Sequence, residues 1–126
     1  MTAVFEGRAA AGLLLLLMSA GLAAAGAFAE DVPEQFAAGR AVYDHWCAAC
    51  HAPGIMHPGT HALMVKYPGG QRATGLITEW HDLPASYVSY MVRHGMSVMP
   101  PFRKTEITDA ELTALAAYLS RNTPEK

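Results

Sequence analysis

The segment Cys47-Ala48-Ala49-Cys50-His51 decides how this sequence is interpreted. Cys-x-x-Cys-His is the attachment pattern for a c-type haem. Two thiols about one helical turn apart can each form a thioether with one haem vinyl group, and the adjacent imidazole then reaches the iron. The pattern therefore predicts that Cys47 and Cys50 hold one covalent haem c and that His51 is the proximal iron ligand.

Three other interpretations of the cysteine pair compete with haem attachment. A thioredoxin-like redox pair needs a βαβ context, and the sequence has no alternating strand pattern. A zinc site needs a second ligand pair at matching spacing. A disulfide between Cys47 and Cys50 would close a loop too short to stabilise the chain much. If both thiols hold haem, no disulfide is expected.

A distal iron ligand is expected downstream of the cysteine pair. Met99 precedes Pro100-Pro101, which stops a helix and holds the chain extended, and Gly95 ends the helix before it. Such a loop can place a thioether against the open face of a haem, so Met99 is the predicted distal ligand. Met96 is the second candidate. The remaining histidines are also candidates: His45, His57, His61, His81 and His94.

Helical patterns predict an all-α chain with no internal repeat. A first helix is predicted over residues 33–50. Residues 52–80 are rich in Gly and Pro, so they are predicted to be mostly loop with a helical turn at 62–66. A third segment is predicted from Asp82, which can cap a helix, to Gly95. The last helix begins at the capping box Thr108-Asp109-Ala110-Glu111, and its apolar face consists of Leu112, Leu115, Ala116 and Leu119.

Length and charge limit the class of protein. The chain has 126 residues, with 9 Lys and Arg against 11 Asp and Glu, which allows one small domain. A formal charge of −2 argues against a nucleic-acid partner, because phosphate binding needs a concentrated basic surface. Apolar residues make up 52% and charged residues 16%, which suits neither a disordered chain nor a multi-span membrane protein.

The N-terminal stretch has the pattern of a secretory signal peptide. Residues 9–29 carry no charge, five leucines follow one another from Leu13, and Ala27-Phe28-Ala29 offers small residues before a cut. This pattern predicts a signal peptide over residues 1–29, one domain over residues 30–126 and a periplasmic location. The alternative is an uncleaved membrane anchor, since these 21 residues can just span a bilayer. A membrane is an expected partner only in that case.

Together these residues resemble the class I, or mitochondrial-type, monohaem cytochromes c. That family crosses its first and last helices, with a Gly and an aromatic residue on one against a Leu and an aromatic residue on the other. Gly39 and Tyr43 have this spacing before the haem motif, and Leu115 and Tyr118 have it on the last helix. The resemblance covers residues 33–121 and implies an all-α fold with three to four helices wrapped around one covalent haem.

The haem surroundings also have candidates. Family members orient the ligating imidazole through the carbonyl of a downstream proline, for which Pro58 is the candidate and Pro53 the alternative. Such a hydrogen bond would fix the ring of His51 and raise its basicity. The candidates for hydrogen bonds to the haem propionates are Tyr67, Arg72 and Trp80.

Residues 82–119 are similar to the small cytochrome subunits and acceptors of periplasmic flavin dehydrogenases, such as those of 4-cresol methylhydroxylase and eugenol hydroxylase. The similar stretches are Leu83-Pro84-Ala85-Ser86-Tyr87-Val88, Val92-Arg93-His94-Gly95 and Met99-Pro100-Pro101-Phe102. The resemblance implies an electron carrier rather than an enzyme. Such a carrier accepts single electrons from a flavoenzyme and passes them to a terminal oxidase or another cytochrome of the respiratory chain.

Iron held by His and Met has no free coordination site, which favours electron transfer. The competing function is a haem enzyme with an open distal site, such as a peroxidase, which requires loss of the Met ligand. The exposed haem edge is predicted to be apolar, with Ala48, Ala49, Val98, Pro100, Pro101 and Phe102. The nearby cations Arg93, Arg103 and Lys104 either steer an acidic partner or form a solvated helix end.

Overall fold

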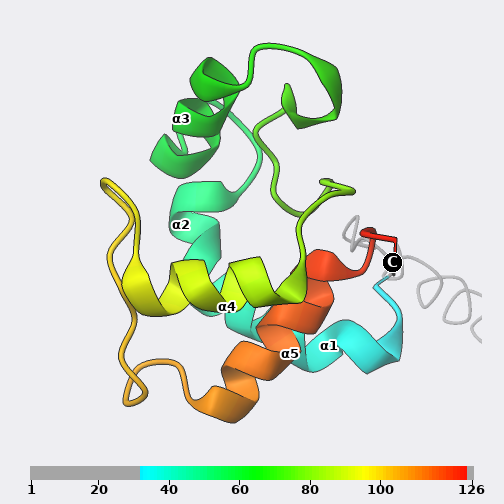
Figure 1. Cartoon of the computed structure of the whole chain (residues 1–126), viewed down its shortest axis with the longest axis vertical. Helices are drawn as coiled ribbons and strands as arrows, with labels where there is room; N and C mark the ends of the chain where they lie inside the picture. Colours follow the sequence, from blue (N-terminus) through cyan, green and yellow to red (C-terminus); the bar gives the residue numbers. More distant parts are fainter. Residues whose placement is uncertain (1–31, 125–126) are drawn as a thin grey trace, which may run out of the picture. The chain divides into compact units, whose positions relative to one another are not determined.

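The computed structural model describes residues 32–124, so the predicted signal peptide lies outside the described residues. The elements in chain order are η1 (Glu34–Phe36), α1 (Ala37–Val42), η2 (Tyr43–Cys47), α2 (Ala48–His51), α3 (Pro58–Lys66), η3 (Gly70–Arg72), α4 (Ala85–His94) and α5 (Asp109–Ser120). Within this part of the chain the only β pairing is an isolated bridge between Met96 and Met99. The prediction of an all-α chain is confirmed (Figure 1).

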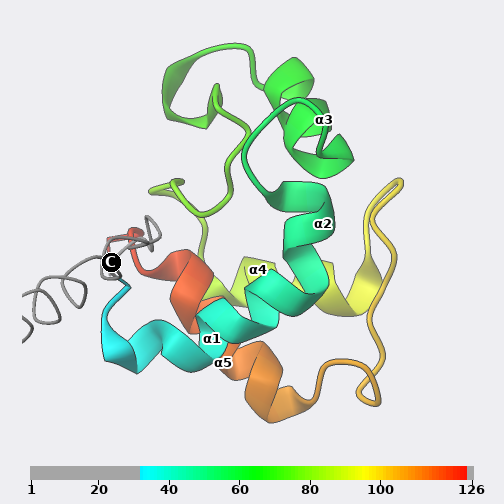
Figure 2. The same ribbon diagram turned by 180° about the vertical axis from the view of Figure 1, so that it is seen from behind.

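The predicted first helix is a continuous helical run, but it is not uniform. Its middle, Tyr43–Cys47, is a π-helical turn between α1 and α2. The axis changes direction at this turn, as Figure 2 shows from behind. Sharp changes of helix direction commonly occur at π-turns, where the backbone accommodates one extra residue. The turn ends at Cys47, so the haem motif begins where the helix redirects.

The crossing of α1 and α5 follows from the absence of a side chain at Gly39. A Cβ there would collide with the carbonyl oxygen of Ala114 and would lie 2.6 Å from Cβ of Tyr118. The rings of Tyr43 and Tyr118 pack beside this contact, with centroids 5.8 Å apart and planes tilted by 57°. Leu115 is fully buried at the same crossing. The helix crossing implied by the resemblance is therefore present.

Gly39→Ala is expected to lower the free energy of unfolding by about 2 kcal/mol, because the added methyl must push two helix backbones apart. Guanidinium unfolding of the haem-loaded protein measures this change. Gly69→Ala is the matched control, since a Cβ at Gly69 meets nothing within 4 Å. Equal unfolding midpoints for the two variants would show that the helices do not cross as closely as described.

The structure corrects the boundaries of two other predicted elements. The helical turn expected at 62–66 is longer, because α3 begins at Pro58. Asp82 does not cap α4; Pro84 occupies the cap position without a side-chain hydrogen bond, and Asp82 pairs with Arg72 instead. The capping box of α5 is confirmed, with both reciprocal hydrogen bonds between Thr108 and Glu111 present.

The hydrophobic core lies where α1, α4 and α5 meet. Its largest fully buried apolar side chains are Tyr118, Ile107 and Leu115. Tyr87 of α4 lies outside this core, because its side chain is 45% exposed. None of the helices in residues 32–124 combines the length and apolar character needed to cross a bilayer.

Candidate functional site

The two cysteines and His51 lie on one short stretch of helix with different exposure. Cys47 is buried, whereas Cys50 is exposed. Burial, reinforced by Cys50, raises the pKa of the Cys47 thiol to about 11. A redox-active pair needs a thiol with a lowered pKa, so this environment argues against the thioredoxin-like interpretation. Burial also lowers the pKa of His51, which favours the neutral imidazole that binds metals.

The backbone around His51 is fixed by side chains from neighbouring elements. Tyr43 Oη donates to the carbonyl of His51 at 2.7 Å, which ties the π-turn to the end of α2. Thr60 is fully buried, and its Oγ1 donates to the carbonyl of Ala52 at 2.9 Å. Nδ1 of His57 lies 3.1 Å from the carbonyl oxygen of Ala49. These contacts hold the start of α3 against α2.

The expected hydrogen bond from His51 to the Pro58 carbonyl is not formed in this structure. Nδ1 of His51 is buried and has no hydrogen-bond partner. The next residue, Gly59, nevertheless meets the ring: a Cβ there would lie 2.7 Å from Cε1 and 2.9 Å from Nδ1 of His51. The first turn of α3 therefore packs on the imidazole, and the role of Pro58 stays a prediction.

The structure distinguishes the two methionine candidates by their burial. Met99 is partly buried and packs against the core, whereas Met96 is 47% exposed. The two residues exchange backbone hydrogen bonds of 2.9 and 3.0 Å, which close a tight hairpin around Ser97 and Val98. Ser97 has a φ of 55° in this hairpin, and Val98 at its tip is 85% exposed. The hairpin thus turns Met99, not Met96, towards the interior.

The three propionate candidates come together in one cluster. The rings of Tyr67 and Trp80 meet edge to face with centroids 5.7 Å apart. The guanidinium of Arg72 lies 5.0 Å from the Tyr67 centroid and 4.6 Å from that of Trp80. Asp82 binds this guanidinium at 2.6 Å, and that hydrogen bond raises the pKa of Arg72. A cation is therefore held against two aromatic faces.

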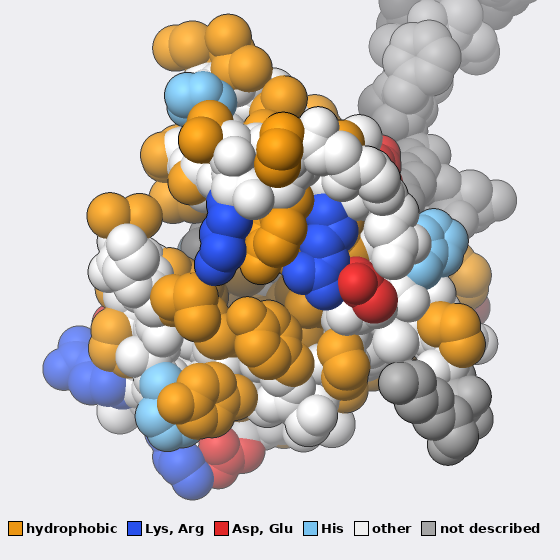
Figure 3. Space-filling view, turned by 45° about the horizontal axis from the view of Figure 1, so that its top comes forward, with side chains coloured by type: hydrophobic (Ala, Val, Ile, Leu, Met, Phe, Trp, Pro, Cys, Tyr) orange, Lys and Arg blue, Asp and Glu red, His pale blue; other side chains and the backbone are white. Residues whose placement is uncertain are grey.

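A recess opens beside this cluster. Its lining includes Lys66, Tyr67, Arg72 and Asp82. Figure 3 shows a hollow on this side of the molecule, with hydrophobic and basic side chains on its rim. Two cations, Lys66 and Arg72, line this recess beside the Tyr67 ring, an arrangement that suits a carboxylate group.

Comparison with known proteins identifies the family. The family profile described as cytochrome C oxidase, cbb3-type, subunit III matches residues 34–119. The chain belongs to the cytochrome c family. This cytochrome is 30% identical over 122 residues to the 4-cresol dehydrogenase (hydroxylating) cytochrome c subunit of Pseudomonas putida, covering 95% of this chain and 92% of the relative. A crystal structure of p-cresol methylhydroxylase with substrate bound is 28% identical, with a TM-score of 0.46, and covers 72% of this chain and 99% of that chain.

Membership of the family implies haem, and the residues present fit it. The cytochrome offers two thiols and an imidazole on one stretch of helix and a partly buried thioether on a separate loop. Trp80 is only 4% exposed and its Nε1 has no hydrogen-bond partner, so it is a free buried donor for a haem carboxylate. No cluster of three or more His, Cys, Asp or Glu side chains within residues 32–124 suits a separate metal ion.

Two contributors to the site were missed from the sequence. Gly59 contacts the imidazole of His51, and Asp82 holds Arg72. The motif Pro58-Gly59 is visible in the sequence, and a close backbone approach is a common reason for glycine. No sequence signal links Asp82 to Arg72, because the pairing depends on how residues 73–81 turn.

Proposed function

We propose that this cytochrome is a periplasmic single-haem electron carrier that receives electrons from a flavin dehydrogenase. Cys47 and Cys50 would hold the haem covalently, and His51 and Met99 would supply the two protein ligands of its iron. The main support is the arrangement of the Cys-x-x-Cys-His motif over the end of η2 and α2, together with an inward-turned Met99 on a separate loop. When bound, the haem supplies one-electron exchange at a potential that thioether ligation raises.

The side chains of this cytochrome would bind the haem, exclude water and supply both iron ligands. Gly59 and the first turn of α3 cover one edge of the His51 ring. Trp80 Nε1 and the Arg72 guanidinium are the proposed partners of the propionates, and Asp82 offsets part of the positive charge. With His51 and Met99 both supplied to the iron, the site would favour electron transfer over peroxidase chemistry.

The proposed donor is a flavin dehydrogenase, and the similar protein from Pseudomonas putida is described as a cytochrome subunit of 4-cresol dehydrogenase (hydroxylating). The surface next to the haem motif supports a protein contact, because Ala49, Val98 and Pro100 are all exposed. A small apolar patch suits a brief encounter of low area. The acceptor is a terminal oxidase or another cytochrome.

The test is to mix the full haem-loaded chain with a purified flavin dehydrogenase of the 4-cresol dehydrogenase (hydroxylating) type. Haem reduction is followed by stopped-flow absorbance after substrate is added to the mixture. We expect the haem to be reduced only when both proteins are present, and the mature chain, recovered from the periplasmic fraction, to begin at Glu30. Haem that stays oxidised with the fully reduced dehydrogenase, or peroxidase turnover by the cytochrome alone, would contradict the proposal.

A further inference from the structure

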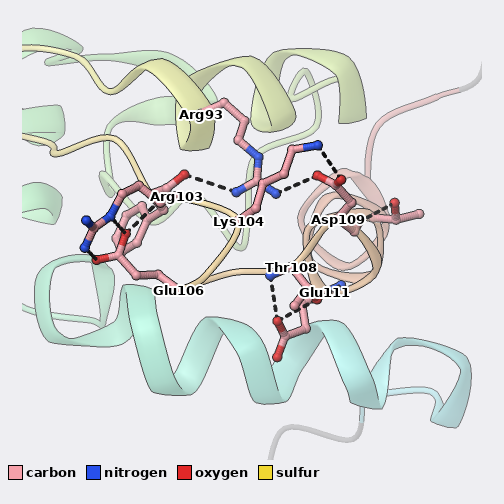
Figure 4. Close-up of polar contacts among 9 residues, drawn as sticks. Arg93, Arg103, Lys104, Glu106, Thr108, Asp109 and Glu111 are labelled. Atoms are coloured by element: carbon pink, nitrogen blue, oxygen red, sulfur yellow. Dashed lines mark hydrogen bonds and ion pairs between the residues drawn. The ribbon is translucent and has the colours of Figure 1, made fainter.

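Arg93 connects three segments around the loop that carries Met99. It lies in the last turn of α4, and its side chain is 18% exposed. Its Nη1 donates to the carbonyl of Phe102 at 3.1 Å, and its Nη2 donates to Oδ1 of Asp109 at 2.9 Å. Figure 4 shows the guanidinium between these two acceptors. The Arg93 cation thus links three segments: the end of α4, the end of the loop of residues 95–102 that carries Met99 (the methionine loop), and the first residue of α5.

The neighbouring cations differ from Arg93 in burial. Arg103 pairs with Glu106 at 3.3 Å, and Lys104 pairs with Asp109 at 2.6 Å. Their side chains are 80% and 73% exposed, so solvent screens both pairs and they contribute little to stability. These ion pairs argue against the interpretation that Arg103 and Lys104 steer an acidic partner protein, because each cation is already paired with a carboxylate. Arg93 is the largely buried member of the group.

The methionine loop is held at both ends. Downstream, Phe102 N–H donates to the carbonyl of Val92 at 2.8 Å, so both backbone polar groups of Phe102 are bound to α4. The Phe102 ring packs edge to face on Trp46, with centroids 5.8 Å apart, directly before Cys47. Upstream, Gly95 has a φ of 69°, and a Cβ there would lie 2.6 Å from the Met99 carbonyl oxygen. The Met99 hairpin is the segment between these fixed ends.

We propose that Arg93 is a positioning residue for the distal ligand. By joining the Phe102 carbonyl to Asp109, its guanidinium holds the methionine loop closed, so that the Met99 thioether stays at the haem iron. This inference rests on the proposed ligation by Met99. The planar fork of arginine can donate to two acceptors in different directions, whereas a lysine ammonium is a point charge on a flexible stem. Arg93→Lys therefore keeps the charge and removes the double hydrogen bond.

The test uses the haem-loaded full chain and an added ligand that competes with Met99. Imidazole is titrated into the ferric protein and its dissociation constant is read from the absorbance spectrum. Loss of one charge-assisted hydrogen bond is expected to tighten imidazole binding about tenfold in Arg93→Lys. The matched control is Arg103→Lys, whose exposed ion pair lies in the same segment between α4 and α5. The imidazole dissociation constant of this variant is expected to stay within about twofold of that of the original protein.

A second pair of variants keeps the test decisive if Arg93→Lys does not fold. Asp109→Asn removes the ion pair but leaves the bond to Phe102, so it should tighten imidazole binding in the same direction by a smaller factor. Lys104→Ala removes only the exposed contact with Asp109 and should have no effect. An imidazole affinity in Arg93→Lys or Asp109→Asn equal to that of its control overturns the proposal, even if the unfolding midpoint falls, because such a result would show a merely structural role.

A failure of the proposed Met99 ligation would give a different result in the absorbance spectrum of the ferric protein. The weak sulfur-to-iron charge-transfer band of the ferric protein reports Met99 at the iron. If Met99→Ala keeps this band, the proposed ligation fails. If Met99→Ala loses the band while Arg93→Lys keeps both the band and the original imidazole affinity, the ligation stands and only the positioning role of Arg93 is refuted.

Discussion

Replacing both Cys47 and Cys50 with alanine is expected to give a chain that keeps no haem after acid–acetone extraction. The original mature chain should carry the mass of one haem and no free thiol, because each cysteine is proposed to form one thioether. Mass spectrometry before and after extraction measures both quantities. Haem that survives extraction in the double variant would refute the covalent attachment.

The same variant is expected to be largely unfolded or molten. In the described chain, no buried hydrophobic side chain lies between Cys47 and Trp80, so that segment has little core of its own to hold it in place. A domain of this size buries a modest share of its surface, and a large cofactor commonly supplies the remainder. Far-ultraviolet and near-ultraviolet circular dichroism distinguish the outcomes. A sharp cooperative melt without haem would show that the crossing of α1, α4 and α5 is stable alone.

Met99→Ala is expected to abolish the sulfur-to-iron charge-transfer band and to lower the reduction potential by on the order of 0.1 V, because a thioether favours ferrous iron. Ferric absorbance spectra and a redox titration measure the two effects. Met96→Ala is the matched control, since Met96 is half exposed on the opposite strand of the same hairpin.

The opposite pattern, with the band lost in Met96→Ala and kept in Met99→Ala, would reverse the ligand assignment. A band that survives in both variants would point to another methionine as the ligand, whereas its absence from the original protein would point to a histidine. Nδ1 of His57 and of His94 already lies within hydrogen-bonding distance of a backbone carbonyl, on Ala49 and Tyr90 respectively, so only Nε2 of either ring is left to bind iron.

Local patterns in the sequence were sufficient to predict several parts of the fold. The capping box at Thr108 and Glu111 acts within four residues, so its geometry follows from sequence spacing. The need for glycine at position 39 was also visible, because the family pattern pairs it with Leu115 and Tyr118. The Cys-x-x-Cys-His motif predicted the cofactor class without any information on tertiary packing.

Other features could not be read from spacing. The π-turn at Tyr43–Cys47 adds one residue to a helix whose apolar pattern looks continuous, so periodicity does not reveal the change of axis. Asp82 looked like a helix cap, because local sequence does not distinguish an aspartate that caps a helix from one that pairs with a distant arginine. Its pairing with Arg72 depends on a loop conformation that brings residues ten positions apart together.

By itself the sequence determined the helical class and the haem motif, and it predicted Met99 rather than Met96 as the distal ligand, because each depends on residues within about one helical turn or on a proline-stiffened loop. The tertiary structure alone decided that Tyr67, Arg72 and Trp80 form one cluster and that Arg93 joins Phe102 to Asp109. The cluster depends on how residues 67–80 fold back on themselves, and the Arg93 contacts depend on how α4 and α5 pack. Neither arrangement is a property of a local stretch of sequence.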